Sequence, residues 1–243
     1  MYDELTLLAQ RKARPGIYYG EPSLRALRDE MAGRELACSL CGQGDLLKVY
    51  CGFMEWYEQR YLPDTGDHAK WWNHLTYLAG GDDRAAFRLF FVRFEAYLAE
   101  MGMALPEKTD QDPLPAAGVV AKLCFDELVF LDTVRCNPGC LPCGASFNGL
   151  YNFLYGMIQG FHRCGAEDQL PLYRAYVMWY KEENEVARQS VGWKTHLLSR
   201  SACSDRQTFY TFFHDMMNYL REHQGIEIPN RAWDWRNMPG ADQ

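Results

Sequence analysis

The stretch that decides the fold is Arg11-Lys-Ala-Arg-Pro-Gly-Ile-Tyr-Tyr-Gly-Glu-Pro-Ser-Leu24, near the start of the chain. A second version, Val134-Arg-Cys-Asn-Pro-Gly-Cys-Leu-Pro-Cys-Gly-Ala-Ser-Phe147, follows at a constant shift of 123 positions. A Pro-Gly step with a second Gly behind it is typical of a turn, because Pro fixes φ and Gly reaches positive φ. Ser23 and Ser146 then stand at the N-cap position in front of an apolar helical pattern. The sequence therefore predicts one type of helix-to-helix connector, used twice.

Side chains of the same type recur through the rest of the chain at nearly the same spacing. The pairs at a shift of 123 are Gly33 and Gly156, Phe53 and Tyr176, Trp56 and Trp179, and Tyr57 and Tyr180. After the loss of one residue the shift is 122, and the pairs are Trp71 and Trp193, His74 and His196, Leu75 and Leu197, Asp83 and Asp205, Phe87 and Phe209, Phe90 and Phe212, Phe91 and Phe213, Tyr97 and Tyr219, and Leu98 and Leu220. Paired Trp, His and double-Phe positions in one order, with a single gap, indicate a tandem duplication.

The predicted fold class is mainly α, with two tandem-duplicated helical repeats packed into one or two lobes. The clearest helix covers 87–101, where apolar side chains fall at i, i+3, i+4, i+7, i+10, i+11 and i+14. Other helices are predicted over 2–12, 52–61, 68–79 and 172–185, whereas 46–51 fits either a strand or a turn. The predicted division is a first repeat over 1–105, an acidic, Pro-rich linker over 106–117, a second repeat over 118–228 and a C-terminal tail over 229–243.

Composition restricts the class of protein. The chain has 243 residues, 48% of them hydrophobic, and a formal net charge of −7 without a basic stripe, so direct nucleic-acid binding is disfavoured. No apolar run approaches the roughly 20 residues of a membrane span. The N-terminus, Met1-Tyr-Asp-Glu4, lacks the basic and apolar regions of a signal peptide, and the nine cysteines are an odd number. We therefore expect a cytoplasmic protein with reduced thiols and no membrane partner.

One cysteine motif has the spacing of a cofactor site. Cys136, Cys140 and Cys143 form a C-x3-C-x2-C pattern, which resembles the cluster-binding signature of radical S-adenosylmethionine enzymes. The resemblance implies a [4Fe–4S] cluster held by three thiolates. In those enzymes the motif follows the first strand of a βα barrel, and an aromatic residue precedes the third Cys. Here the following residues show helical patterns, and Pro142 takes the place of that aromatic residue.

The repeat argues against a metal at this loop. The three cysteines align with Ala13, Ile17 and Gly20, so the first copy of the loop is built without any cysteine. A zinc site that recruits Cys164 is a further alternative. We favour free thiols, and we predict no cofactor and no metal ligand in the chain.

No catalytic residue is assigned. His74 and His196 share a repeat position, which fits either half of a symmetric metal or acid–base site or a histidine hydrogen-bonded in the core. We favour the core position. The chain has no HExxH, P-loop, GxGxxG or GxSxG motif, so we expect that it is not an enzyme.

A family resemblance gives the functional expectation. The string Arg14-Pro-Gly-Ile-Tyr-Tyr-Gly-Glu-Pro-Ser-Leu24, followed by Met31 and Gly33, resembles the opening of a group of small bacterial proteins with the pattern R-P-G-[MI]-Y-x-G-x-x-S-L-x-x-L…G. These proteins occur among accessory and immunity genes beside polymorphic toxins. The resemblance implies a toxin-neutralising binding protein and identifies no catalytic residue.

The leading hypothesis is a cytoplasmic immunity protein that binds a cognate secreted toxin domain and occludes its active site. Acidic groups would meet a toxin cleft that is basic because its substrate is nucleic acid or a nucleotide. The partner-binding candidates are acidic side chains in loops and at helix ends where the two copies differ most, namely Asp64, Asp67, Glu167, Asp168, Glu182 and Glu183. The alternatives are a metal- or iron–sulfur-dependent enzyme using the cysteine motif, and a structural helical scaffold.

Overall fold

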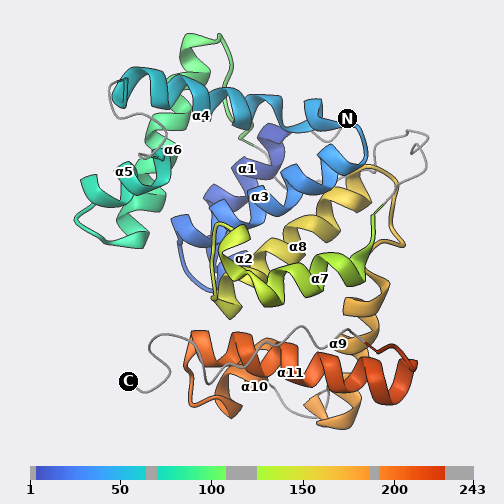
Figure 1. Cartoon of the computed structure of the whole chain (residues 1–243). Helices are drawn as coiled ribbons and strands as arrows, with labels where there is room; N and C mark the ends of the chain where they lie inside the picture. Colours follow the sequence, from blue (N-terminus) through green and yellow to red (C-terminus); the bar gives the residue numbers. More distant parts are fainter. Residues whose placement is uncertain (1–3, 64–69, 108–124, 187–191, 228–243) are drawn as a thin grey trace. The chain divides into compact units, whose positions relative to one another are not determined.

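The computed structural model describes residues 4–63, 70–107, 125–186 and 192–227, and these ranges are mainly helical with no strand. The helices are α1 Glu4–Ala13, α2 Pro15–Tyr19, α3 Leu24–Leu40, α4 Lys48–Tyr61, α5 Trp71–Leu78, α6 Asp83–Glu100, α7 Glu127–Cys136, α8 Phe147–Arg163, α9 Pro171–Glu183, α10 Trp193–Arg200 and α11 Asp205–Gln224 (Figure 1). The described residues also include the short 3-10 helices η1 Gly44–Leu47 and η3 Pro138–Cys140. The prediction of a mainly α fold is confirmed.

The first connector is more helical than the sequence predicts. Helix α1 ends at Ala13, as expected ahead of a proline, but Pro15 then begins the short helix α2. Proline suits the first helical position, because its fixed φ is helical and its missing N–H has no partner there. Residues 46–51 are neither a strand nor a turn, since they belong to η1 and to the first turn of α4.

Two serines cap the helices that follow the connectors, as predicted. The hydroxyl oxygens of Ser23 and Ser146 each accept a hydrogen bond from the backbone N–H three residues on, at 3.0 Å. Each hydroxyl also donates to a carboxylate, Ser23 to Asp83 at 2.5 Å and Ser146 to Asp205 at 2.6 Å. Each cap therefore satisfies a helix N–H and joins the start of its helix to the start of a distant one.

The chain divides into two compact units. Unit 1 is residues 1–124 with 152–167, and unit 2 is residues 125–151 with 168–243. Helix α8 begins in unit 2 and continues in unit 1, whereas the sequence-based division places all of α8 in the second repeat. The repeat boundaries stay a prediction. Residues 108–117 of the predicted linker and the predicted tail over 229–243 lie outside the described residues.

Unit 1 has an aromatic core where α4, α5 and α6 pack together (Figure 1). Phe53, Trp71, Phe90 and Phe94 are buried in it. The Phe53 ring centroid lies 5.2 Å from that of Phe90 and 5.3 Å from that of Phe94, both edge-on. Edge-on aromatic pairs add to the stabilisation that burial of the rings provides. This core positions the surface that α5 and α6 share.

Glycines let α3 and the unit 1 part of α8 touch backbone to backbone, and the two helices lie side by side in Figure 1. A Cβ on Gly33 would lie 2.0 Å from the carbonyl oxygen of Phe153. A Cβ on Gly156 would lie 2.0 Å from the carbonyl oxygen of Glu30. The two contacts are equivalent in the repeat. Gly156 lies 123 positions after Gly33, and Phe153 lies 123 positions after Glu30. Only glycine fits at either position.

Unit 2 contains counterparts of contacts in unit 1. Carboxylate oxygens of Glu4 accept hydrogen bonds from first-turn N–H groups of α4 at 2.6 and 3.1 Å, and those of Glu127 accept them from α9 at 2.7 and 2.8 Å. Trp56 lies against Phe53 and Tyr97, with ring centroids 6.0 and 5.5 Å away, and Trp179 lies against Tyr176 and Tyr219, at 5.9 and 5.1 Å. The two tryptophans therefore have like surroundings.

Candidate functional site

The predicted acidic residues do not form one cluster. Asp64 and Asp67 lie outside the described residues. Glu167 and Asp168 are exposed in the turn before α9, and Glu182 and Glu183 are exposed at the other end of that helix. At about 1.5 Å of rise per residue, roughly 20 Å separates the two ends. The four described carboxylates therefore present two separate acidic points.

The cysteine motif does not gather its thiols around a common point. Cys136 ends α7 and donates from its Sγ to a carboxylate oxygen of Asp132 at 3.7 Å, while Cys140 is exposed in η3. Cys164, the further zinc ligand considered above, is buried and hydrogen-bonds to Cys38 instead. Within the ranges that the structure describes, no group of three or more His, Cys, Asp or Glu side chains is arranged to hold a metal ion.

The repeated histidines are hydrogen-bonded to buried tyrosines. The Tyr57 hydroxyl lies 3.0 Å from His74 Nδ1, and the Tyr180 hydroxyl lies 2.9 Å from His196 Nδ1. Burial raises the pKa of Tyr57 to about 12 and also raises the pKa of Tyr180, so both phenols stay protonated at neutral pH. Both histidines are hydrogen-bonded, as expected, but they are half-buried and so lie at the edge of the core and not inside it.

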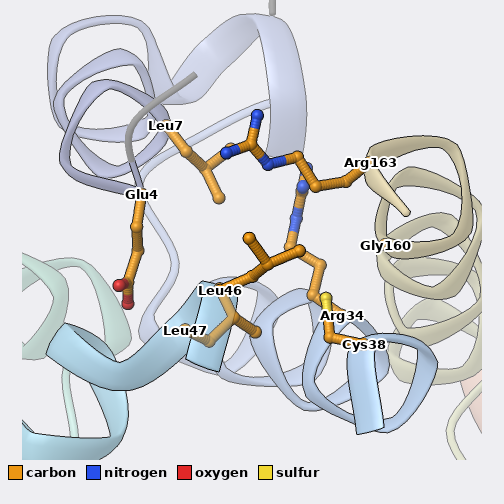
Figure 2. Close-up of a pocket in the computed structure, with 8 residues that line it drawn as sticks. All are labelled: Glu4, Leu7, Arg34, Cys38, Leu46, Leu47, Gly160 and Arg163. Atoms are coloured by element: carbon orange, nitrogen blue, oxygen red, sulfur yellow. The ribbon is translucent and has the colours of Figure 1, made fainter. Parts of the chain in front are cut away.

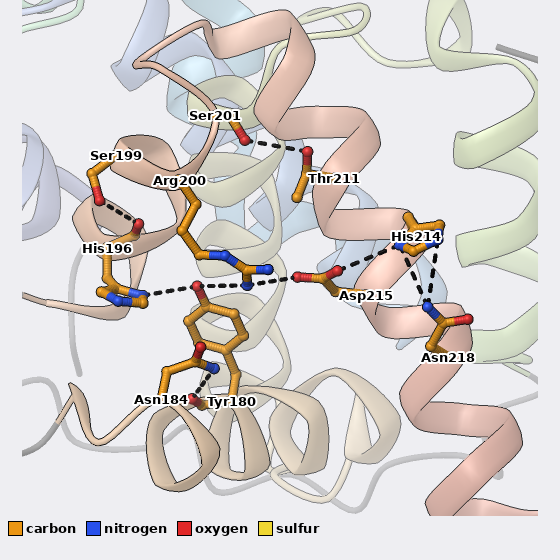
Figure 3. A network of polar contacts seen from close by, with 10 residues as sticks. All are labelled: Tyr180, Asn184, His196, Ser199, Arg200, Ser201, Thr211, His214, Asp215 and Asn218. Atoms are coloured by element: carbon orange, nitrogen blue, oxygen red, sulfur yellow. Dashed lines mark hydrogen bonds and ion pairs between the residues drawn. The ribbon is translucent and has the colours of Figure 1, made fainter. Parts of the chain in front are cut away.

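A polar network continues from this pair onto the surface of unit 2 (Figure 3). The Arg200 guanidinium lies between the Tyr180 hydroxyl, at 3.4 Å, and the Asp215 carboxylate, at 3.0 Å. The His214 ring approaches the same carboxylate at 3.5 Å. The network joins α9, α10 and α11 through polar atoms that bind one another.

The equivalent surface of unit 1 exposes apolar side chains. Tyr77 and Leu78 at the end of α5 are 80% and 48% exposed, and Val92 on α6 is 60% exposed. We call these three residues the α5–α6 patch. Beside Val92, the Nη1 group of Arg93 donates to the Tyr61 hydroxyl at 3.1 Å, whereas its buried Nε–H finds no acceptor among the described residues. Three large apolar side chains are thus exposed on two helices that pack together, and exposed apolar surface can mark an interaction site.

A buried ion cluster anchors the stretch that opens the sequence. Glu30 has no exposed surface, and its carboxylate accepts hydrogen bonds from Arg11 at 2.6 Å, Arg34 at 2.8 Å and the Tyr19 hydroxyl at 2.6 Å. The Arg11 guanidinium also lies 3.6 Å from the centroid of the Tyr18 ring. Burial opposes ionisation of Glu30, but the two guanidiniums outweigh it and lower the pKa of Glu30 to about 2.

This cluster was not predicted from the sequence, because its members are separated along the chain. Arg11 and Glu30 are 19 residues apart, and neither stands in a known motif with the other. One signal was available: at the shift of 123, Arg11, Glu30 and Arg34 become Val134, Phe153 and Met157. When several charged residues are all replaced by apolar residues in the second copy, they are expected to contact one another in the first. The decay of the string in the second copy accompanies the loss of this cluster.

Unit 1 contains two small cavities. One has a volume of about 20 Å³ and is lined by Glu4, Leu7, Arg34, Cys38, Leu46, Leu47, Gly160 and Arg163 (Figure 2). The other has about 70 Å³ and is lined by Leu24, Arg25, Arg28, Trp72, Asn73 and Thr76. Sites for drug-sized ligands are typically about 300 to 1,000 Å³. Neither cavity therefore accommodates more than a few atoms.

Two further findings do not concern a single site. Within the described ranges, no helix combines the length and apolar character that a membrane crossing requires. Comparison with protein-family models, with curated proteins and with solved structures finds nothing that matches the chain.

Proposed function

We propose that the chain is an immunity protein that binds a cognate toxin domain and covers its active site. The support from sequence is the resemblance of residues 14–24 to proteins encoded beside polymorphic toxins. The support from geometry is the set of paired contacts, including Tyr57–His74 and Tyr180–His196, that fit two copies of one helical repeat. On this proposal the copies share an interior, and partner recognition belongs to the surfaces where they differ.

The observation that carries the proposal is the α5–α6 patch. Tyr77, Leu78 and Val92 expose apolar surface in unit 1. At the matching place in unit 2, Arg200 and Asp215 close the surface with an ion pair at 3.0 Å. Two copies with alike interiors and unlike surfaces are expected if one copy carries the contact with a partner. An exposed tyrosine is well suited to anchor such a contact, since it buries a large ring and keeps a polar end.

Charge supplies the second part of the proposal. A toxin that acts on nucleic acid or nucleotides has a basic cleft, and a net charge of −7 attracts it. Exposed carboxylates at the rim of an interface mainly raise the association rate, while buried aromatic anchors slow dissociation. We assign the first role to Asp64, Asp67, Glu167, Asp168, Glu182 and Glu183, and the second to the α5–α6 patch.

The test is co-expression with the toxin encoded beside this chain, together with binding kinetics on the purified pair. The double variant Tyr77→Ala, Leu78→Ser should lose protection, and the dissociation constant should rise about 30-fold or more, the equivalent of about 2 kcal/mol at a hot spot. The matched control is Val129→Ala on α7, which shortens an apolar side chain that is 60% exposed and lies outside the patch. The control should protect and bind as the natural protein does.

Two outcomes would contradict the proposal. Equal protection by the patch variant and the control would show that the α5–α6 patch has no part in binding. Protection by the natural protein without any detectable complex would show that it acts on the toxin or its product by turnover, and occlusion would then be wrong.

A further inference from the structure

Three buried thiols meet where α3 and α8 end. Cys38 lies in the last turn of α3, Cys41 caps that helix, and Cys164 follows α8 directly. The Sγ of Cys164 donates a hydrogen bond to the Sγ of Cys38 over 3.9 Å, and Cys41 interacts with the same Cys164 sulfur. The glycine contact between α3 and α8 brings the two helix ends together. Cys38 and Cys164 are 126 positions apart in the sequence, so no local motif joins these two.

One of the three thiols borders a charged cavity. Cys38 lines the cavity of about 20 Å³ together with Arg34 and Arg163 (Figure 2). In Figure 2 the Arg34 side chain lies between those of Arg163 and Cys38. Two guanidiniums beside a sulfur favour its anionic form, and the thiolate is the nucleophilic form of cysteine.

Electrostatics separates the roles of the sulfurs. The hydrogen bond from Cys164 lowers the pKa of Cys38 against the effect of burial, and the positive charges of Arg34 and Arg163 lower it further. The same hydrogen bond raises the pKa of Cys164 well above its ordinary value. Burial raises the pKa of Cys41 to about 12. Of the three thiols, Cys38 is the one that lines the cavity beside Arg34 and Arg163, so its sulfur is placed to ionise and to meet a small oxidant.

We propose that Cys38 is a peroxide-reactive thiol and that Cys164 resolves its oxidised form as a disulfide. The Cys38 thiolate attacks one oxygen of hydrogen peroxide, the O–O bond breaks, and the departing hydroxide takes a proton to become water. The product is a sulfenic acid on Cys38. The Cys164 sulfur gives up its proton and attacks the Cys38 sulfur, the S–O bond breaks, and the hydroxyl leaves as a second water. In total, two thiols pass two electrons to one peroxide.

The cavity restricts the oxidant to a small molecule. A space of about 20 Å³ admits a molecule of water size, and hydrogen peroxide has only two heavy atoms. Oxidised glutathione is far larger than this space and cannot reach the sulfur without displacement of η1, whose Leu46 and Leu47 form one wall. The site therefore distinguishes a peroxide from a bulky disulfide oxidant by size.

Disulfide formation needs only a local change. A disulfide bond is about 2.0 Å long, so the two sulfurs, which lie 3.9 Å apart, must approach each other by about 2 Å. The bond would connect the end of α3 to the residue after α8 and close a long loop of the chain, which should raise the melting temperature. A thiol reductant would reverse the reaction by thiol–disulfide exchange.

The experiment treats the fully reduced, full-length chain with hydrogen peroxide and maps the products by mass spectrometry after alkylation of free thiols. We expect a peptide pair joined through Cys38 and Cys164, which forms several-fold faster than oxidation of the exposed Cys140 and Cys203, since neighbouring guanidiniums favour the Cys38 thiolate. In Cys164→Ser, mass spectrometry should find one added oxygen on Cys38, the sulfenic acid. Oxidised glutathione should give the joined peptides at least about tenfold more slowly than peroxide.

One control variant and one variant of the cavity lining complete the test. Cys203→Ser should react as the natural chain does. Arg163→Gln should slow the reaction about threefold. Loss of the positive charge lowers the fraction of Cys38 that is thiolate, but the remaining thiolate is more nucleophilic, which offsets part of that loss. A joined peptide that involves other cysteines, or oxidation of Cys38 no faster than of Cys203, overturns the proposal. Both results are read from the natural chain and so do not depend on how any variant folds. Equal rates with peroxide and oxidised glutathione would overturn the size selection.

Discussion

At the scale of single residues, Glu30 shows how a buried charge can be tolerated. Its carboxylate has no exposed surface, and two guanidiniums and one phenol meet it at hydrogen-bonding distance. Each of those donors comes from the opening stretch or from the next helix. The cluster therefore explains why Arg11 and Tyr19 accompany the Pro-Gly turn in the first copy. Its contribution to stability depends on the carboxylate remaining ionised.

Glu30→Gln should lower the free energy of unfolding at pH 7 by about 3 to 5 kcal/mol, because it leaves Arg11 and Arg34 buried without their counter-charge. Urea denaturation of the natural chain and the variant measures the difference. The control is Glu95→Gln, since Glu95 pairs with Lys12 on the surface and its side chain is 43% exposed. That change should cost less than about 1 kcal/mol. Equal costs would show that the Glu30 cluster is not stabilising.

Glu30 should also give the protein an acid-sensitive component of stability. The folded state lowers its pKa from 4.5 to about 2, so this contribution is complete above pH 4.5 and is lost as the pH falls towards 2. The natural chain should therefore lose roughly 3 kcal/mol more than Glu30→Gln across that window. Denaturation of both proteins at several pH values between 6 and 2 measures this loss. The difference between their free energies of unfolding cancels the contribution of the other carboxylates. Parallel curves would contradict the assignment.

At the scale of elements, the α3–α8 pair depends on glycine at two positions. The space for a Cβ at Gly33 or Gly156 is filled by a backbone carbonyl oxygen at 2.0 Å, and a backbone cannot rotate away as a side chain can. Gly33→Ala and Gly156→Ala should each cost about 3 kcal/mol or more or prevent folding. The comparison is Gly16→Ala in α2, where nothing lies within 4 Å, and which should stabilise by about 0.5 to 1 kcal/mol. Thermal melts decide, and a mild effect at Gly33 would mean that the helices can separate.

The elements could be predicted from sequence because their signals are local. Apolar spacing located α6, and the serine caps located the starts of α3 and α8. The single turn of α2 was missed, because a Pro-Gly step suits both a turn and the start of a helix. The Glu30 cluster and the pair of Cys38 and Cys164 were missed for another reason. Their members lie far apart in sequence and meet only through packing of whole helices.

At the scale of the whole molecule, charge rather than shape should govern how fast a partner arrives. Neutralising Asp64, Asp67, Glu167, Asp168, Glu182 and Glu183 to their amides removes six of the carboxylates behind the net charge of −7. The association rate with the toxin at low salt should fall about tenfold or more, and its dependence on ionic strength should flatten, while dissociation stays the same. Stopped-flow binding at several salt concentrations measures this. At about 0.5 M salt the two proteins should associate at similar rates. Equal rates at low salt would refute steering by these groups.

The division of the chain also has a consequence for its synthesis. Unit 1 needs residues 152–167, which leave the ribosome only after the chain has passed through α7. At about 5 to 20 residues per second, the interval between the end of α6 and residue 167 lasts roughly 3 to 13 seconds. During that time the face of α3 that contains Gly33, and the side chains that are buried around it in the folded protein, are not yet covered by α8. Codon choice between residues 101 and 167 thus sets how long chaperones must shield the first half, and slow codons there should lower the yield of folded protein.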